Sequence, residues 1–109
     1  MDIIRDDIRD AIEKELCGAN ERFPLFASMH EAAAVIAEER DEAAEAMKNM
    51  CDHFDMAWRL IKNNSEISLQ CITRMKFAAE ELAVEACQVA AMCEKAVQSA
   101  AEWKGNTEA

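Results

Sequence analysis

Between Pro24 and Gly105 the chain contains neither proline nor glycine. These residues most readily end helices and form tight turns, so the backbone has few places to reverse along this stretch. The composition is also rich in Ala, Glu, Met and Lys, which favour helices, and it contains no Tyr. The sequence therefore predicts an all-α protein built on long helices, and its 109 residues fit a single domain spanning 1–109.

The N-terminal segment predicts a helix over residues 2–17. Its apolar residues recur every four positions with charged residues between them: Ile4, Ile8, Ile12 and Leu16. Gly18 is a candidate C-terminal cap, and Pro24 prevents the helix from continuing through the loop that follows. In this loop Phe23 and Phe26 either plug the end of a helical bundle or flank a ligand.

Two local signals predict the ends of two long helices. Ser28-Met29-His30-Glu31 matches a capping box and predicts a helix over 29–62. Asn63-Asn64-Ser65 is the strongest turn signal of the second half, and it predicts a third helix over 66–103, with a frayed tail at 104–109. We expect a helical bundle with one short helix and two long antiparallel helices. Three helices of these lengths cannot cover both long ones, so a homodimer or higher oligomer should complete the bundle.

The charge of the chain restricts its partners. With 22 acidic and 12 basic residues the formal net charge is −10. Direct nucleic-acid binding is disfavoured because it depends on Lys and Arg contacts with phosphates, and an acidic membrane leaflet is disfavoured for the same reason. No apolar run approaches the roughly 20 residues of a membrane span. A divalent cation, a basic protein or a nucleotide–Mg²⁺ complex remains compatible with this charge.

The chain has an odd number of cysteines and no CxxC pair: Cys17, Cys51, Cys71, Cys87 and Cys93. This pattern favours reduced, buried thiols rather than a disulfide framework or a zinc site. We therefore expect a cytoplasmic protein.

Acidic residues form a stripe on each long helix. Glu39 and Glu42 are three residues apart in Glu38-Glu39-Arg40-Asp41-Glu42, and Glu85 and Gln88 have the same spacing on the third helix, after Glu81. A hairpin that turns near Asn64 places Glu39 level with Gln88, and Glu42 level with Glu85. Carboxylates that meet in this way repel by roughly 1 kcal/mol per pair even in water. Either the side chains splay into solvent as acidic faces, or a cation such as Mg²⁺, which prefers oxygen ligands, lies between them.

These motifs resemble a known family. Glu38-Glu39-Arg40-Asp41-Glu42 is an EExxE motif like that of the MazG-type all-α NTP pyrophosphohydrolases, and Glu85-Ala86-Cys87-Gln88 resembles their downstream ExxD element. The segments 23–31 and 88–92 also resemble small MazG-like proteins of phages and prophages. Two features depart from the family pattern: Gln88 stands where the family has Asp, and the two motifs are further apart than usual.

The resemblance implies a nucleotide-binding protein that uses Mg²⁺ or Mn²⁺. Glu39, Glu42 and Glu85 would be metal ligands, Gln88 a weak ligand or substrate contact, and Glu38 a catalytic carboxylate that orients water. In the family, a metal-activated water attacks a nucleoside triphosphate and releases pyrophosphate and the monophosphate. The chain's candidates for binding phosphate are Arg40, Lys48, Arg59 and Arg74.

Three functions remain open from the sequence. The first is a MazG-like pyrophosphohydrolase. The second is a non-catalytic phage-type protein in the host cytoplasm that sequesters a nucleotide or inhibits a host defence protein, which the neutral Gln88 favours. The third is a helical oligomer with a structural role.

Overall fold

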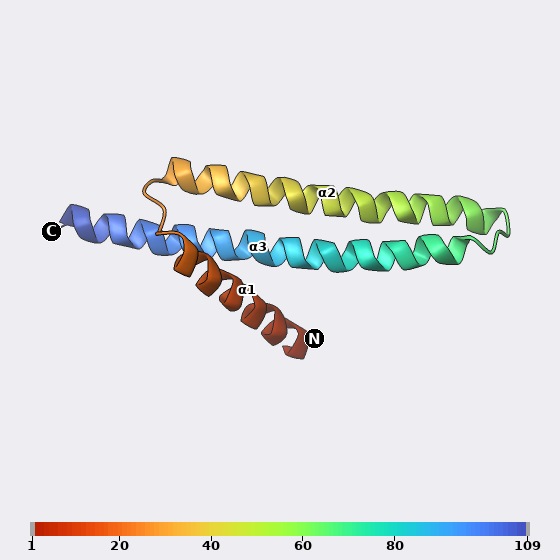
Figure 1. The fold of residues 1–109 in the computed structure, drawn as a ribbon, viewed down its shortest axis with the longest axis horizontal. Coiled ribbons are helices and arrows are strands. Elements are labelled where there is room, and N and C mark those ends of the chain that lie inside the picture. Colours follow the sequence, from red (N-terminus) through yellow and green to blue (C-terminus); the bar gives the residue numbers. More distant parts are fainter. Residues whose placement is uncertain (1, 109) are drawn as a thin grey trace. The chain divides into compact units, whose positions relative to one another are not determined.

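A computed structural model describes the backbone of residues 2–108 and the side chains of residues 2–103. Within that range the chain forms three helices and no strand: α1 Asp2–Arg22, α2 Met29–Lys62 and α3 Ser68–Glu108 (Figure 1). The predicted all-α helical fold is confirmed. None of the three helices, as far as they are described, combines the length and apolar character needed to cross a membrane.

The first helix continues past the end predicted at residue 17. Gly18 lies inside α1, which ends at Arg22, so its predicted role as a cap is wrong. A glycine inside a helix lowers its stability by about 1 kcal/mol relative to alanine. The packing of residues before and after Gly18 in the sequence offsets this loss. Leu16 is buried in a hydrophobic core, and Ala19 packs against the same core.

The predicted capping box begins α2. The backbone N–H of Glu31 donates to the Ser28 hydroxyl at 3.1 Å, and the Glu31 carboxylate accepts from the N–H of Ala27 at 3.3 Å. The first bond satisfies a donor that the first turn of a helix otherwise leaves without a partner, and the second ties Glu31 to the loop just before the cap. The helix therefore begins at Met29 and ends at Lys62, which confirms the predicted bounds.

The turn between α2 and α3 is built around Asn64, whose φ of 56° is left-handed. The N–H of Ser65 donates to the carbonyl of Leu60 at 2.9 Å, and the N–H of Asn64 donates to the carbonyl of Ile61 at 3.0 Å. This pair of bonds is the Schellman motif, with asparagine in the position that glycine usually occupies. The predicted turn is confirmed.

The third helix starts and ends later than the sequence predicts. Hydrogen bonds between residues three apart hold residues 65–70 in tighter turns, so α3 begins at Ser68 rather than at 66. Its backbone continues beyond the predicted end at 103 to Glu108. The predicted fraying of 104–109 falls outside the residues whose side chains are described.

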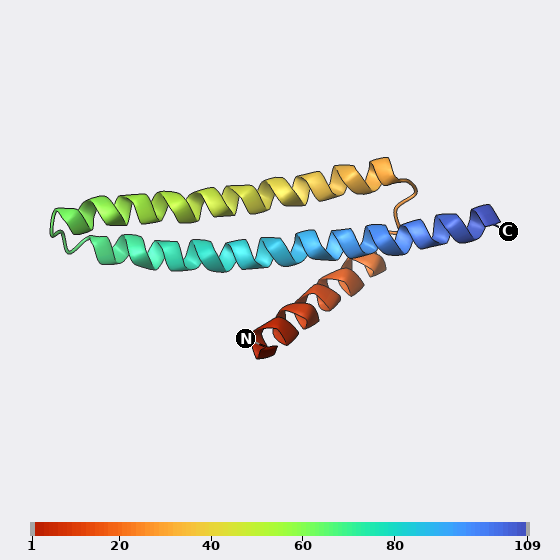
Figure 2. The same ribbon diagram turned by 180° about the vertical axis from the view of Figure 1, so that it is seen from behind.

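The chain divides into two compact units. The first contains α1, α2 up to Arg40 and α3 from Ala86 onward, and the second contains residues 41–85. In the second unit, the end of α2 and the start of α3 run antiparallel on either side of the turn at Asn64 (Figure 1, Figure 2). Whether the whole chain unfolds as a single domain stays a prediction.

The first unit contains the larger core. It is formed by Leu16 of α1, Phe26 of the loop, Ala32 of α2, and Ala91, Met92 and Ala96 of α3. Phe26 is fixed at both of its backbone polar groups: its N–H donates to the buried Ser99 hydroxyl at 2.9 Å, and its carbonyl accepts from the Trp103 indole at 2.9 Å. Phe26 thus plugs the unit, which is one of the two roles that the sequence left open, whereas Phe23 is exposed.

The second unit buries only small side chains. Ala46, Ala57 and Cys71 are buried, whereas Phe54, Trp58 and other large apolar residues of this unit are exposed. Two antiparallel helices share a single contact face, so much of their apolar surface has no neighbour in the described chain.

The cysteines are free thiols, as the sequence predicts, but most are not buried. Cys71 is buried and Cys87 half-buried, whereas Cys17, Cys51 and Cys93 are exposed. The prediction of buried thiols is wrong for these three cysteines, because each lies on a helix face that no other described element covers.

We expect the Ser99 hydroxyl to stabilise the conformation of the loop at Phe26. It accepts from Phe26 N–H and donates to the carbonyl of Lys95 at 2.7 Å. Ser99→Ala would leave the buried N–H without a partner, at a cost of about 1–3 kcal/mol. We expect a clearly lower melting temperature by circular dichroism.

Thr73→Ala is the matched control for this variant. The Thr73 hydroxyl also donates to a carbonyl four residues earlier, that of Leu69 at 3.0 Å, but it is exposed. This control should melt close to the wild type. Equal melting temperatures for the two variants would show that Ser99 does not hold the loop.

Candidate metal-binding site

The second unit carries a hollow of about 410 Å³ that is lined mostly by acidic residues. The acidic residues that line it are Asp41, Glu42 and Glu45 of α2, and Glu81 and Glu85 of α3. No lysine, arginine or histidine of the described chain lines this hollow. It therefore concentrates negative charge without a cation from its own wall.

Helix spacing accounts for this concentration. Glu42 and Glu45 are three residues apart on α2, and Glu81 and Glu85 are four apart on α3, so each pair shares one face of its helix. The turn at Asn64 brings the two faces level, and Glu42 meets Glu85 as the hairpin register predicts.

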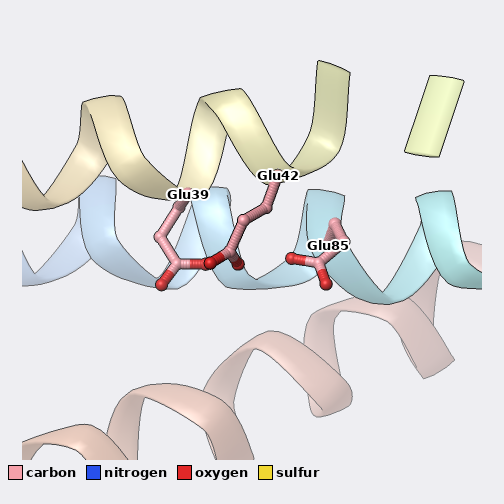
Figure 3. A group of neighbouring side chains, drawn as sticks. All are labelled: Glu39, Glu42 and Glu85. Atoms are coloured by element: carbon pink, nitrogen blue, oxygen red, sulfur yellow. The ribbon is translucent and has the colours of Figure 1, made fainter. Parts of the chain in front are cut away.

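Glu39 joins this pair from one turn earlier on α2. One carboxylate oxygen from each of Glu39, Glu42 and Glu85 lies within 4.8 Å of the others (Figure 3). Glu39 and Glu85 are half-buried, and Glu42 is exposed. This separation is suited to a common ligand for all three groups, because oxygens bound to one small cation lie closer together than unbound carboxylates prefer.

The clustering changes the acidity of Glu85. Burial raises the pKa of this carboxyl to about 7, with further contributions from hydrogen bonds to Glu81 and Glu42 and from the negative charges of both. A carboxyl group that retains its proton close to neutral pH occupies a site where an added negative charge is poorly compensated. A cation that replaced the proton would relieve the same repulsion.

Two further residues of the predicted site are Glu38 and Gln88. Glu38 is exposed on α2, about 100° around the helix axis from Glu39. Gln88 is half-buried on α3, one turn after Glu85, and it has an interaction partner within the protein. Of the basic residues considered for phosphate, Lys48 pairs with Asp52 at 2.7 Å. The roles of Glu38 and Gln88 stay predictions.

Glu45 was not among the predicted site residues, and Glu81 was noted only as part of a stripe. The signal was present in the sequence, since Glu45 follows Glu42 by three residues and Glu81 precedes Glu85 by four. Glu45 thus lies on the same helix face as Glu42, and Glu81 on the same face as Glu85. Both Glu42 and Glu85 were already identified as candidate site residues.

Searches of protein-family models, of curated proteins and of solved structures found no match to this chain. The resemblance to MazG-type proteins accordingly rests on the motifs of the sequence alone.

The acidity of Glu85 predicts how stability changes with pH. Its pKa is higher in the folded protein, at about 7, than the ordinary 4.5, so the folded state binds this proton more tightly. The stabilisation is complete below about pH 4.5 and is lost as the pH rises through 7. Glu85→Gln mimics the protonated form and should therefore gain stability over the wild type progressively from about pH 5 to about pH 8.

Urea unfolding in metal-free buffer at several pH values measures this difference. Glu80→Gln removes an equal charge from an exposed position on the same helix and is the matched control. The difference between the two variants at each pH measures the contribution of Glu85. A gain for Glu85→Gln that stays constant across this range would contradict the assigned acidity.

Proposed function

We propose that this chain is a divalent-cation-dependent nucleotide-binding protein of the MazG-like type, with Glu39, Glu42 and Glu85 as ligands of Mg²⁺ or Mn²⁺. The observation that carries the proposal is the approach of three carboxylates to within 4.8 Å of one another. Two of them, Glu39 and Glu42, belong to the EExxE motif, and Glu85 opens the second motif.

The chemistry of these residues fits such an ion. Carboxylate oxygens are the hard ligands that Mg²⁺ and Mn²⁺ prefer, and Mg²⁺ retains several waters when protein ligands are few. The raised pKa of Glu85 is a further reason, because a cation would replace the proton that this carboxyl otherwise retains. A bound metal would neutralise phosphate charge and acidify a coordinated water. Glu38 would orient that water, and Gln88 would contact the substrate or bind weakly through its amide oxygen.

A second function has its own support in Gln88. The amide lacks the negative charge of the Asp that the resemblance leads one to expect, and loss of an anionic ligand weakens a magnesium site. The same fold without turnover would sequester a nucleotide, or present its acidic hollow to a basic surface of a host protein. We propose this non-catalytic binder, in a host cytoplasm, as the alternative.

The proposed assembly is a homodimer or larger oligomer. Its support is the set of large exposed apolar side chains of the second unit, among them Phe54, Trp58 and Phe77. We expect light scattering at micromolar concentration to give at least twice the mass of one chain. A monomeric mass would refute this assembly.

Metal binding should stabilise the folded protein. At a free metal concentration of 100 times Kd, one site contributes about 2.7 kcal/mol. A chain of about 100 residues gains about 4–8 °C per kcal/mol, so the melting temperature should rise on the order of 10 °C with Mg²⁺ or Mn²⁺. Glu42→Gln should abolish this rise, whereas Glu80→Gln, outside the cluster, should keep it.

The control for this measurement is NaCl at matched ionic strength, because salt alone screens a surface of net charge −10. Only the rise beyond that control counts as binding. If Mg²⁺ and Mn²⁺ raise the melting temperature of the wild type no more than NaCl does, the carboxylates belong to solvated acidic faces. The metal site is then refuted.

Gln88→Asp distinguishes the enzyme from the binder. It restores the acidic residue of the ExxD element, so it should tighten metal binding and increase the metal-dependent melting shift. Pyrophosphate release from a panel of nucleoside triphosphates measures activity. Turnover in the wild type supports the enzyme, and turnover only in Gln88→Asp supports a binder that has lost catalysis. Metal binding without turnover in either protein excludes the pyrophosphohydrolase.

A further inference from the structure

The α2 helix of the second unit carries a row of exposed apolar side chains. Its members alternate at spacings of three and four residues: Ala44, Met47, Cys51, Phe54, Trp58 and Ile61. All six are exposed, and the four large ones are 43–50% exposed. This alternation keeps a row on one side of a helix and is typical of the seam between two packed helices. The row therefore has the pattern of a packed seam, although its large members face solvent.

A neighbouring row on α2 shows such a seam in use within the chain. It precedes the exposed row by one residue, and its members are buried or half-buried: Ala43, Ala46, Met50, His53, Ala57 and Leu60. The antiparallel α3 helix has a buried or half-buried row of the same spacing: Ser68, Cys71, Met75, Ala78 and Leu82. These two rows form the contact between the helices of the unit, so α2 carries two adjacent seams and α3 occupies one of them.

The α3 helix has an exposed row as well. It follows the packed row of α3 by one residue, and its members are all exposed: Leu69, Ile72, Lys76, Ala79 and Ala83. Lys76 is the only charged member, and its ammonium lies 5.5 Å from the centre of the Phe77 ring, which is not part of the row. A lysine can place its ammonium beside a row in this way while its stem adds apolar surface.

The two exposed rows lie on the same side of the hairpin. Each residue of an α-helix is turned by about 100° from the one before it. Because α2 and α3 run antiparallel, rows that follow the packed rows by one residue turn to the same side. We call these two rows together the outer face. Rows that precede the packed rows turn to the opposite side, and they include Glu42, Glu45 and Glu81 of the acidic hollow.

The charges of the second unit are unevenly distributed along the hairpin. Residues 51–77, next to the turn, include four basic and three acidic residues, whereas residues 41–50 and 78–85, at the other end, include one basic and six acidic residues. Two copies with their turns at the same end would bring two strongly acidic ends together. Copies with their turns at opposite ends place each acidic end beside the basic residues of the other copy. Charge thus favours an antiparallel pair of copies.

The sizes of the side chains on the outer face favour the same arrangement. The large side chains next to the turn are Trp58, Ile61, Leu69 and Ile72. The small ones at the other end are Ala44, Ala79 and Ala83. Copies with their turns at the same end would crowd the large side chains and leave space between the small ones. Copies with their turns at opposite ends set large against small, as close packing requires.

We propose that a second copy of this chain covers the outer face, with its turn at the opposite end, so that the two hairpins form an antiparallel four-helix bundle. A two-fold axis perpendicular to the helices places each α2 against the other α2. With the rows fully overlapped, Met47 lies near Trp58 of the partner subunit, and Ala44 lies near Ile61 of the partner subunit. The inference rests on the proposed assembly but not on the metal ion, because the acidic hollow on the opposite side stays open.

Met47→Glu should weaken the dimer at least roughly tenfold, because it buries a carboxylate in an apolar seam. Sedimentation equilibrium measures the dissociation constant, and circular dichroism checks that the variant keeps its helices. Met56→Glu is the matched control. Met56 lies on the same helix and is 44% exposed, against 49% for Met47, but it belongs to the row on the side of the hollow. This control should dissociate like the wild type.

A cross-linking experiment tests the direction of the pair. Ala44→Cys and Ile61→Cys are combined in a chain whose exposed Cys17, Cys51 and Cys93 are replaced by alanine. Along α2 the two positions are about 26 Å apart, so a short bismaleimide can join them only between copies. We expect a covalent dimer from the double variant and none from either single variant.

The outcomes separate the interface from the assembly. A monomeric wild type refutes both. If the wild type is an oligomer that Met47→Glu and Met56→Glu weaken equally, the interface is overturned and the assembly is not. Cross-linking in a single variant, or none in the double variant, overturns the antiparallel arrangement. None of these results bears on the metal site, which is tested through Glu42.

Discussion

The register of the hairpin depends on the left-handed residue at Asn64. Its positive φ, with hydrogen bonds from Ser65 and Asn64 to the last carbonyls of α2, ends that helix and reverses the chain within a few residues. A turn of this kind fixes which residues of the two helices lie level. In the second unit it places Glu42 opposite Glu85, although like charges at that distance repel. The acidic hollow is a consequence of that register.

The charges gathered around the hollow of the second unit are all negative. In the second unit Glu85 lies among other carboxylates, and its pKa is raised to about 7. Proteins compensate such groups with protons, ions or ligands, because burial of an isolated charge is costly. The acidic hollow of the second unit is thus suited to a cation.

Local signals predicted much of the fold and part of the site. The cap at Ser28 and the turn at Asn64 each lie within a few residues, so the sequence was sufficient to place both ends of α2. The meeting of Glu42 with Glu85 followed from the position of the turn. The end of α1 was missed because packing at Leu16 and Ala19 outweighs the glycine between them. The burial of Lys95 had no local signal, since it depends on residues far away in the sequence, such as Phe26.

The central proposal is that the carboxylates of Glu39, Glu42 and Glu85 share one metal ion. The most direct test is anomalous X-ray scattering from a crystal soaked with Mn²⁺, because the signal locates the ion itself. We expect one strong peak within bonding distance of carboxylate oxygens from all three residues, and we expect this peak to be absent in Glu42→Gln. A map with no peak at these side chains, from a crystal with the soaked ion at high concentration, would contradict the proposal.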